Sequence, residues 1–241
     1  MINVLHLYYD LLNLYGENAN LRAIVHNLEL NNIKVKVDLK TINDQIDFEK
    51  YDIVYIGQGS EENLLLALND ILKRRNDLIN YIDNDKYMFL TGNAMCLFGS
   101  KINDNKSEID ALNIFDYKSN YLTKSTFKNA SSDRIVGEVI CTTNLIKHKV
   151  IGFQNRCDII SDIDTPIFKT DIKYSNDGTN NNEGFNYKNV YATHLIGPLF
   201  IRNPYLLDYF LKKVCESKNL KYESLDKTAI NAYKKYLSNF N

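Results

Sequence analysis

The feature that most constrains the fold is an alternation of strand-like and helix-like segments through the first half of the chain. Short β-rich runs alternate with amphipathic stretches whose apolar residues recur at helical spacing. The β-rich runs span 2–8, 34–39, 51–57 and 86–91, and the amphipathic stretches span 18–32 and 62–82. Because crossover helices favour parallel strand pairing, we expect an α/β fold, an open and mostly parallel sheet with helices on both faces.

The second half of the chain is richer in strands. Strand-like runs span 111–115, 134–140, 149–155, 166–170 and 189–197, and a polar Gly/Asn-rich loop spans 174–184. Asn203 and Pro204 provide an N-cap and a first-turn proline for a helix, and a last amphipathic segment spans 225–240. No internal repeat or linker-like stretch is found, so we expect a single domain over residues 1–241.

Composition and charge narrow the classes of partner. A net charge of −1 gives no reason to expect a nucleic-acid partner or an anionic membrane surface. No run approaches the roughly 18 apolar residues of a spanning helix, and the N-terminus lacks a signal-peptide pattern. We therefore expect a cytoplasmic protein without direct membrane insertion. The cysteines lack metal-ligand spacing and no P-loop is present, so no metal or other cofactor is expected.

One short stretch has the layout of a catalytic elbow. In FLTGNAMCLFG (89–99), an apolar run stops at Thr91, Gly92 and Asn93 make a turn, and a helix-like pattern restarts at Ala94. Many α/β enzymes place a nucleophile at such a turn, because it lifts one side chain beside free helix N–H groups. Here the apex is glycine.

A second glycine-containing turn follows the strand-like run that ends near residue 57. Gly57 and Gly59 lie in IGQGS, between this run and the next helix-like stretch. The two glycines could cradle an anion, or they could form a plain tight turn.

Four longer stretches resemble a known family. HLYYDLLNLYGENAN (6–20) is similar to the motif H-L-Y-P-D-L-L-N-L-Y-G-D-x-G-N, and IGQGSEEN (56–63) to G-G-G-x-D. VIGFQNR (150–156) is similar to a G-F-E-N-H segment, and the stretch 182–204 to E-G-x-x-Y-K-N-x-x-G-T-Y-L-H-G-P-L-L-x-x-N-P. These motifs, in this order, are those of the GatD-type glutamine amidotransferases, class I enzymes of the cobyric-acid-synthase-like branch. The resemblance implies a flavodoxin-like sheet, in agreement with the pattern above.

The resemblance also implies a reaction and a partner. Family members hydrolyse glutamine with a Cys–His pair and pass the ammonia to a partner. The GatD type works with a Mur-ligase-like subunit, MurT, which uses ATP to amidate the D-glutamate of lipid II in bacterial peptidoglycan biosynthesis. We therefore expect a heterodimer with a MurT-like Mur ligase subunit, while cobyric-acid-type amidation stays open as the acceptor chemistry.

Carried over onto this chain, the family's catalytic site is incomplete. Gly92 stands at the nucleophile position, Ile196 at the histidine position and Ile159 at the position of an arginine that helps hold glutamine. A thioester intermediate needs a thiolate and a base within hydrogen-bond reach. We therefore expect a degenerate subunit without glutaminase activity. Its remnant pocket, open to a glutamine-like ligand, is expected to include Gly57, Gly59, Gly92, Asn93, Asn155, His194 and Gly197.

Two alternatives stay open at this point. Cys96 lies one helical turn beyond the elbow, and His194 lies two residues before Ile196 on the same strand face. If both side chains turn inward, a displaced Cys96/His194 dyad would keep the amidotransferase active. Otherwise Cys96 is a buried small residue and His194 a structural one. The second alternative is a non-catalytic binding or regulatory module that takes no part in amidation.

Overall fold

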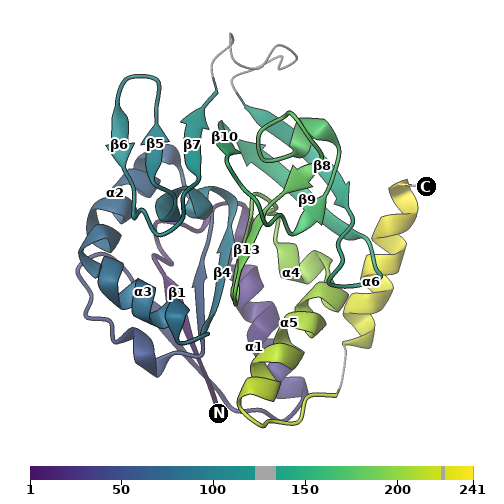
Figure 1. Ribbon diagram of the computed structural model, residues 1–241. Coiled ribbons are helices and arrows are strands. Elements are labelled where there is room, and N and C mark those ends of the chain that lie inside the picture. Colours follow the sequence, from purple (N-terminus) through teal and green to yellow (C-terminus); the bar gives the residue numbers. More distant parts are fainter. Residues whose placement is uncertain (123–133, 224–225, 241) are drawn as a thin grey trace.

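In the computed structural model, which describes residues 1–122, 134–223 and 226–240, a six-stranded sheet runs through the centre of the molecule (Figure 1). The strand order is β13-β14-β4-β3-β1-β2, and only β13 is antiparallel to its neighbour. The strands are β1 (Ile2–Leu7), β2 (Val35–Lys40), β3 (Ile53–Ile56), β4 (Tyr87–Thr91), β13 (Phe185–Tyr187) and β14 (Val190–Thr193). The five parallel strands follow the order 2-1-3-4-5 of flavodoxin-like folds, which confirms the expected open sheet.

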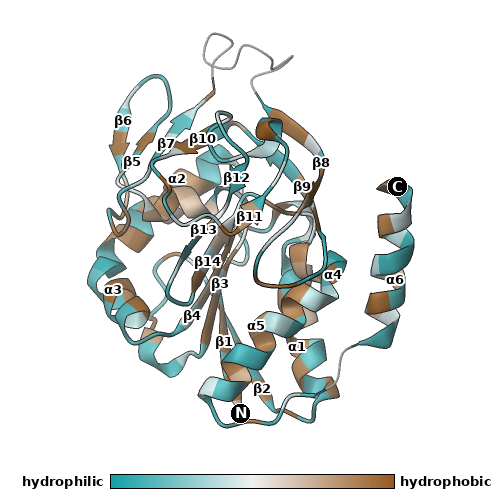
Figure 2. Cartoon of the chain, turned by 45° about the vertical axis from the view of Figure 1, so that its right-hand side comes forward, coloured by the Kyte–Doolittle hydropathy of each residue, from teal (hydrophilic) through white to brown (hydrophobic). Residues whose placement is uncertain are grey.

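Helices cover both faces of this sheet, as expected. One face carries α2 (Glu61–Ile71) and α3 (Arg75–Asp83), and the other carries α1 (Asn18–Leu30), α4 (Leu199–Arg202) and α5 (Pro204–Ser217). In β3, Val54 and Ile56 pack into the apolar core under α2 and α3. Ile53 and Tyr55 pack into the core on the opposite face, under α1, α4 and α5. All four residues are buried, because successive side chains of a strand point to opposite faces and both faces are covered (Figure 2).

The last helix, α6 (Lys227–Leu237), lies against α4 and α5 at the side of the molecule (Figure 1). It falls within the amphipathic segment expected from the sequence, whose first residue, Leu225, lies outside the described residues. Within the described ranges, no helix is long and apolar enough to cross a membrane.

Short strands from residues 101–183 form smaller sheets near the carboxyl edge of the main sheet. A four-stranded sheet contains β5 (Lys101–Asn103), β6 (Glu108–Asp110), β7 (Lys118–Tyr121) and β10 (Asp158–Ser161). Two antiparallel pairs are β8 (Ile135–Cys141) with β9 (Val150–Arg156) and β11 (Phe168–Lys169) with β12 (Asn182–Glu183). The expected strands at 166–170 and 189–197 are therefore present but shorter.

The prediction of a strand at residues 111–115 is wrong. This segment instead wraps the end of the short 3₁₀ helix η4 (Gly92–Phe98). Its backbone N–H groups donate to the carbonyls of residues 97–100, so they are not available for a strand ladder. Asn113 adopts a left-handed backbone conformation, which also interrupts an extended strand.

The single helix expected over 62–82 is also wrong, because the 3₁₀ turn η3 (Leu72–Arg74) separates α2 from α3. The backbone of Arg74 leaves the helical region at φ −109° and ψ 10°. Its guanidinium group bonds Asp70 at 3.2 Å and the carbonyl of Asp44 at 2.7 Å. These contacts hold the break in place.

The helix α5 begins at Asn203 and Pro204, as expected, but the Asn203 side chain does not cap it. Asn203 Oδ1 accepts from the N–H of Ile151 at 2.7 Å, and Nδ2 donates to the carbonyls of Ile151 and Leu199 at 2.7 and 2.8 Å. A single buried amide therefore joins β9 to α4 and the start of α5.

Candidate active site

The turn after β4 has the geometry of a nucleophile elbow with glycine at its apex. Gly92 has φ +61°, in the left-handed region that glycine tolerates best. The helix expected to restart at Ala94 is instead the 3₁₀ helix η4, which begins at Gly92 itself, and all seven of its residues are buried. The sequence therefore located the turn, and the structure determines what surrounds its apex.

The side chain of Gln58 fills the space above Gly92. A Cβ atom added to Gly92 would lie 1.8 Å from Gln58 Oε1 and 2.7 Å from Gln58 Cβ. Gln58 Oε1 accepts from the backbone N–H of Asn93 at 2.6 Å, and Nε2 donates to the carbonyl of Gly59 at 3.0 Å. The Gln58 carboxamide thus fills the space into which a nucleophile side chain at position 92 would project. Its oxygen also accepts the hydrogen bond of the next backbone N–H group, that of Asn93.

Gln58 was not among the site residues predicted from the sequence. A signal was present, because Gln58 is the only residue with a side chain in Gly57-Gln58-Gly59, where the similar family motif reads G-G-G. The consequence of that one substitution depends on the three-dimensional approach of two loops.

The loops that contain the expected pocket glycines pack tightly together. A Cβ on Gly59 would lie 2.3 Å from Leu12 Cδ2, and a Cβ on Gly57 would lie 2.6 Å from the Leu12 carbonyl oxygen. The Asn93 carboxamide exchanges two hydrogen bonds with the Gly59 backbone, each 3.0 Å long. The structure therefore brings Gly57, Gly59, Gly92 and Asn93 together and fills the volume between them.

A buried carboxyl group lies beneath these loops. Glu17 Oε2 accepts hydrogen bonds from the hydroxyl groups of Tyr55, at 2.6 Å, and of Thr91, the residue before Gly92. Burial raises the pKa of Glu17 to about 7, against the opposing effect of these two hydrogen bonds. Glu17 therefore ties the loop after β1 to the ends of β3 and β4.

The segment that carries the family's histidine position lies at the same edge of the sheet. Thr193 of β14 is opposite Thr91 of β4, so His194 and Gly92 follow paired residues. Ile196 is buried, and its backbone exchanges hydrogen bonds of 2.9 and 3.2 Å with Phe153.

Gly197, expected in the pocket, and Ile159, at the family's arginine position, have different surroundings. Gly197 is half-buried, and a Cβ there would be 3.3 Å from Phe153 Cβ. Ile159, at the arginine position, is half-buried on β10 opposite Asn120 of β7.

Cys96 and His194 both reach one oxygen of Asp158. Cys96 Sγ lies 3.5 Å from Asp158 Oδ2, and His194 Nε2 lies 3.2 Å from the same atom. The Ser119 hydroxyl donates to Cys96 Sγ at 3.2 Å. On the other side of the imidazole, His194 Nδ1 lies 3.4 Å from Glu183 Oε1 without hydrogen-bond geometry.

This cluster is sealed from solvent, since Cys96 is 0% exposed and Asp158 and His194 are each 1% exposed. Burial raises the pKa of the Cys96 thiol well above its ordinary value, and the Asp158 carboxylate raises it further. Burial also raises the pKa of Asp158, but His194 and Arg156 outweigh this effect and lower it to about 2. Cys96 is therefore a thiol that donates to a carboxylate.

Asn155, also expected in the pocket, belongs to a separate network nearer the surface. Its Nδ2 donates to the Tyr15 hydroxyl at 2.7 Å, and Arg134 Nε donates to its Oδ1 at 2.8 Å. Arg134 also forms an ion pair with Glu61 at 2.7 Å. The seven expected pocket residues thus lie in distinct environments along one edge of the sheet.

Comparison with known proteins assigns the chain to a family. The CobB/CobQ-like glutamine amidotransferase domain matches residues 3–204. The chain belongs to this family. Two curated CobB/CobQ-like relatives are both named lipid II isoglutaminyl synthase (glutamine-hydrolyzing) subunit GatD. The one from Staphylococcus aureus is 26% identical over 92% of this chain and 88% of its own length. The one from Streptococcus pneumoniae is 25% identical over 84% of this chain and 76% of its own length.

Solved structures agree on the fold. A glutamine amidotransferase from Thermotoga maritima, 13% identical, aligns over 97% of this chain and 92% of its own with a TM-score of 0.51. The glutaminase domain of Trypanosoma brucei CTPS with bound acivicin, 11% identical, aligns over 94% and 98% with a TM-score of 0.55. The CobB/CobQ-like chain therefore shares the amidotransferase fold over nearly its whole length.

Proposed function

We propose that this chain is a GatD-type subunit of an enzyme that amidates lipid II, and that it does not hydrolyse glutamine itself. The names of its two relatives support the subunit role and the lipid II assembly. We further propose that its partner is a MurT-like Mur ligase subunit, bound as a heterodimer, which performs the ATP-dependent amidation. In this arrangement the partner uses free ammonia.

The observation that carries the proposal is the Gln58 carboxamide above Gly92. Glycine supplies no nucleophile, and a side chain at its position would collide with Gln58 Oε1. The Asn93 N–H, which in this geometry could stabilise an oxyanion, already donates to Gln58. Ile196 cannot accept a proton as a general base. Nucleophile, base and oxyanion donor are therefore all compromised at one site.

The displaced dyad is the second candidate, because Cys96 and His194 approach the same Asp158 oxygen. Three features argue against it. The Cys96 thiol points to a carboxylate, which disfavours the thiolate needed for attack. The cluster is buried, so glutamine has no direct access to it. The Cys96 sulfur also already accepts a hydrogen bond from the Ser119 hydroxyl group.

A glutaminase assay separates these candidates. We expect the purified chain, alone and with the Mur-ligase-like protein of the same organism, to release no ammonia from glutamine above a buffer blank. The electrophilic glutamine analogue 6-diazo-5-oxo-norleucine should leave no adduct on Cys96 by mass spectrometry. Amidation by the complex should depend on added ammonium salt. Glutamine hydrolysis that is lost in both Cys96→Ala and His194→Ala would instead establish the displaced dyad.

Restoring the site tests the role of Gln58. Gly92→Cys with Ile196→His should stay inactive, because Gln58 still occupies the space above residue 92. Adding Gln58→Gly should open that space, and the triple variant should form an adduct with the analogue on the new cysteine. Equal labelling of the double and triple variants would show that Gln58 does not block the site.

A further inference from the structure

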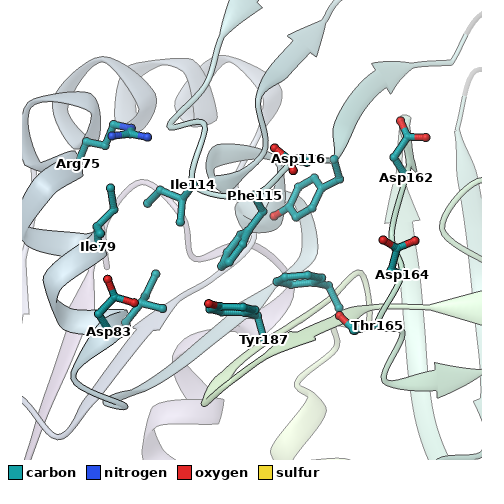
Figure 3. A pocket seen from close by; sticks show the side chains of 13 residues that line it. Arg75, Ile79, Asp83, Ile114, Phe115, Asp116, Asp162, Asp164, Thr165 and Tyr187 are labelled. Carbon is teal, nitrogen blue, oxygen red and sulfur yellow. The ribbon is translucent and has the colours of Figure 1, made fainter.

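A cavity of about 490 Å³ opens beside the edge strand β13, apart from the elbow (Figure 3). It lies between α3, the loops 114–117 and 162–165, and β13. Its 13 lining residues include none of those that surround Gly92. Neither the family's chemistry nor the remnant site accounts for it.

Aromatic rings form the floor of this cavity. The Phe115 ring lies at the centre, with its centroid 4.6 Å from that of Phe185 and 5.6 Å from that of Tyr187. Ile79 and Ile114 add aliphatic surface at the side of α3 (Figure 3). Phe185 is buried, whereas Tyr187 is 45% exposed, so the aromatic floor is open to a ligand from solvent.

Carboxylates surround the floor. Asp162 and Asp164 lie on one side of the cavity and Asp83 of α3 lies on the other, while Asp116 follows Phe115 in the loop between them (Figure 3). Asp83 forms an ion pair with Lys188 at 3.1 Å. Within the described parts of the chain, the other three carboxylates have no basic group within ion-pair distance.

The one basic lining residue does not neutralise them. Arg75 directs its guanidinium group to the backbone carbonyls of Leu112 and Asn113, at 2.6 and 2.7 Å. The cavity therefore combines an aromatic floor with an excess of negative charge.

This combination fits a cationic group carried on an apolar stem. Aromatic faces attract ammonium and guanidinium groups, and the stems of lysine and arginine pack on apolar surface while their charges reach carboxylates. An anionic ligand would be repelled. The charges lie on exposed residues around an aromatic centre, as in protein interfaces, whereas pockets for small molecules enclose most of the ligand.

We propose that this cavity is the docking site for a lysine- or arginine-bearing segment of the partner subunit. This docking site rests on one part of the proposed function, namely that the chain is a subunit of a complex. It further specifies the surface of this chain that binds the partner and the side chains that the partner presents there. Arginine and tyrosine are, with tryptophan, the residue types most enriched among those that dominate binding energy at such centres.

The test compares two charge-matched variants for binding to the Mur-ligase-like protein. The cavity variant carries Asp116→Asn, Asp162→Asn and Asp164→Asn. The control variant carries Glu29→Gln, Glu49→Gln and Glu216→Gln, three exposed acids outside the cavity. All six residues are exposed, so both variants should fold, which thermal unfolding verifies.

We expect the cavity variant to raise the Kd for the partner at least tenfold and to flatten its dependence on salt, while the control stays within twofold of wild type. A Tyr187→Ala variant should also weaken binding. If wild type binds the partner and the cavity variant binds equally well, the docking inference fails and the proposed function stands. If wild type forms no complex, the proposed partner fails and the inference fails with it.

A spermidine titration of the isolated chain tests a different occupant. Binding of spermidine that the cavity variant loses, together with unchanged affinity for the partner, would assign the cavity to a free organic cation and overturn the proposal.

Discussion

The buried carboxyl group of Glu17 makes the stability of the folded chain depend on pH. Burial raises its pKa from 4.5 to about 7, so the folded chain holds this proton more tightly than the unfolded chain. The resulting stability is fully present below about pH 4.5 and is lost as the pH rises to about 7. The free energy of unfolding falls by an amount on the order of 3 kcal/mol over this range, because each unit of pKa difference corresponds to about 1.4 kcal/mol.

Glu17→Gln should remove this dependence, because the carboxamide keeps an oxygen acceptor for Tyr55 and Thr91 without ionising. Relative to wild type, the variant should be more stable at pH 8, by up to about 3 kcal/mol, and closest to it at pH 4.5. Urea denaturation at several pH values measures the difference, with the exposed Glu62→Gln as the control. Parallel pH profiles for wild type and Glu17→Gln would contradict the assignment.

At the scale of elements, Asn203 joins β9 to α4 and α5 through three hydrogen bonds to backbone groups. Asn203→Ala should lower the free energy of unfolding by about 3 kcal/mol, because buried backbone groups lose their partners. Asp226→Ala at the start of α6 removes an ordinary side-chain cap, which should cost only about 1 kcal/mol. Chemical denaturation compares the two, and equal losses would show that the three hydrogen bonds of Asn203 contribute no more than one ordinary helix cap.

At the scale of the whole molecule, buried contacts join the smaller sheets to the main one. Phe153 of β9 bonds Ile196, and Asp158 of β10 contacts Cys96 and His194. We therefore expect residues 1–241 to unfold as a single domain in one transition. Circular dichroism and tyrosine fluorescence should give the same urea midpoint. Two separated transitions would show that the smaller sheets form an independent unit.

The sequence by itself determined the order of the main strands and helices, the position of the elbow and the family. These features depend on local periodicity and on residue identity, which can be read without knowing which distant residues meet. The absence of a side chain at Gly92 is likewise a fact of the sequence alone.

Only the tertiary structure decided what surrounds the elbow. Gln58 meets Asn93 across 35 positions of sequence, and Cys96 meets Asp158 across 62. The segment 111–115 is not a strand because its N–H groups bond the end of η4, a contact that strand propensity does not encode. The residue identities set which chemical groups were available, and long-range packing decided which of them met, because no local pattern specifies contacts between loops so far apart.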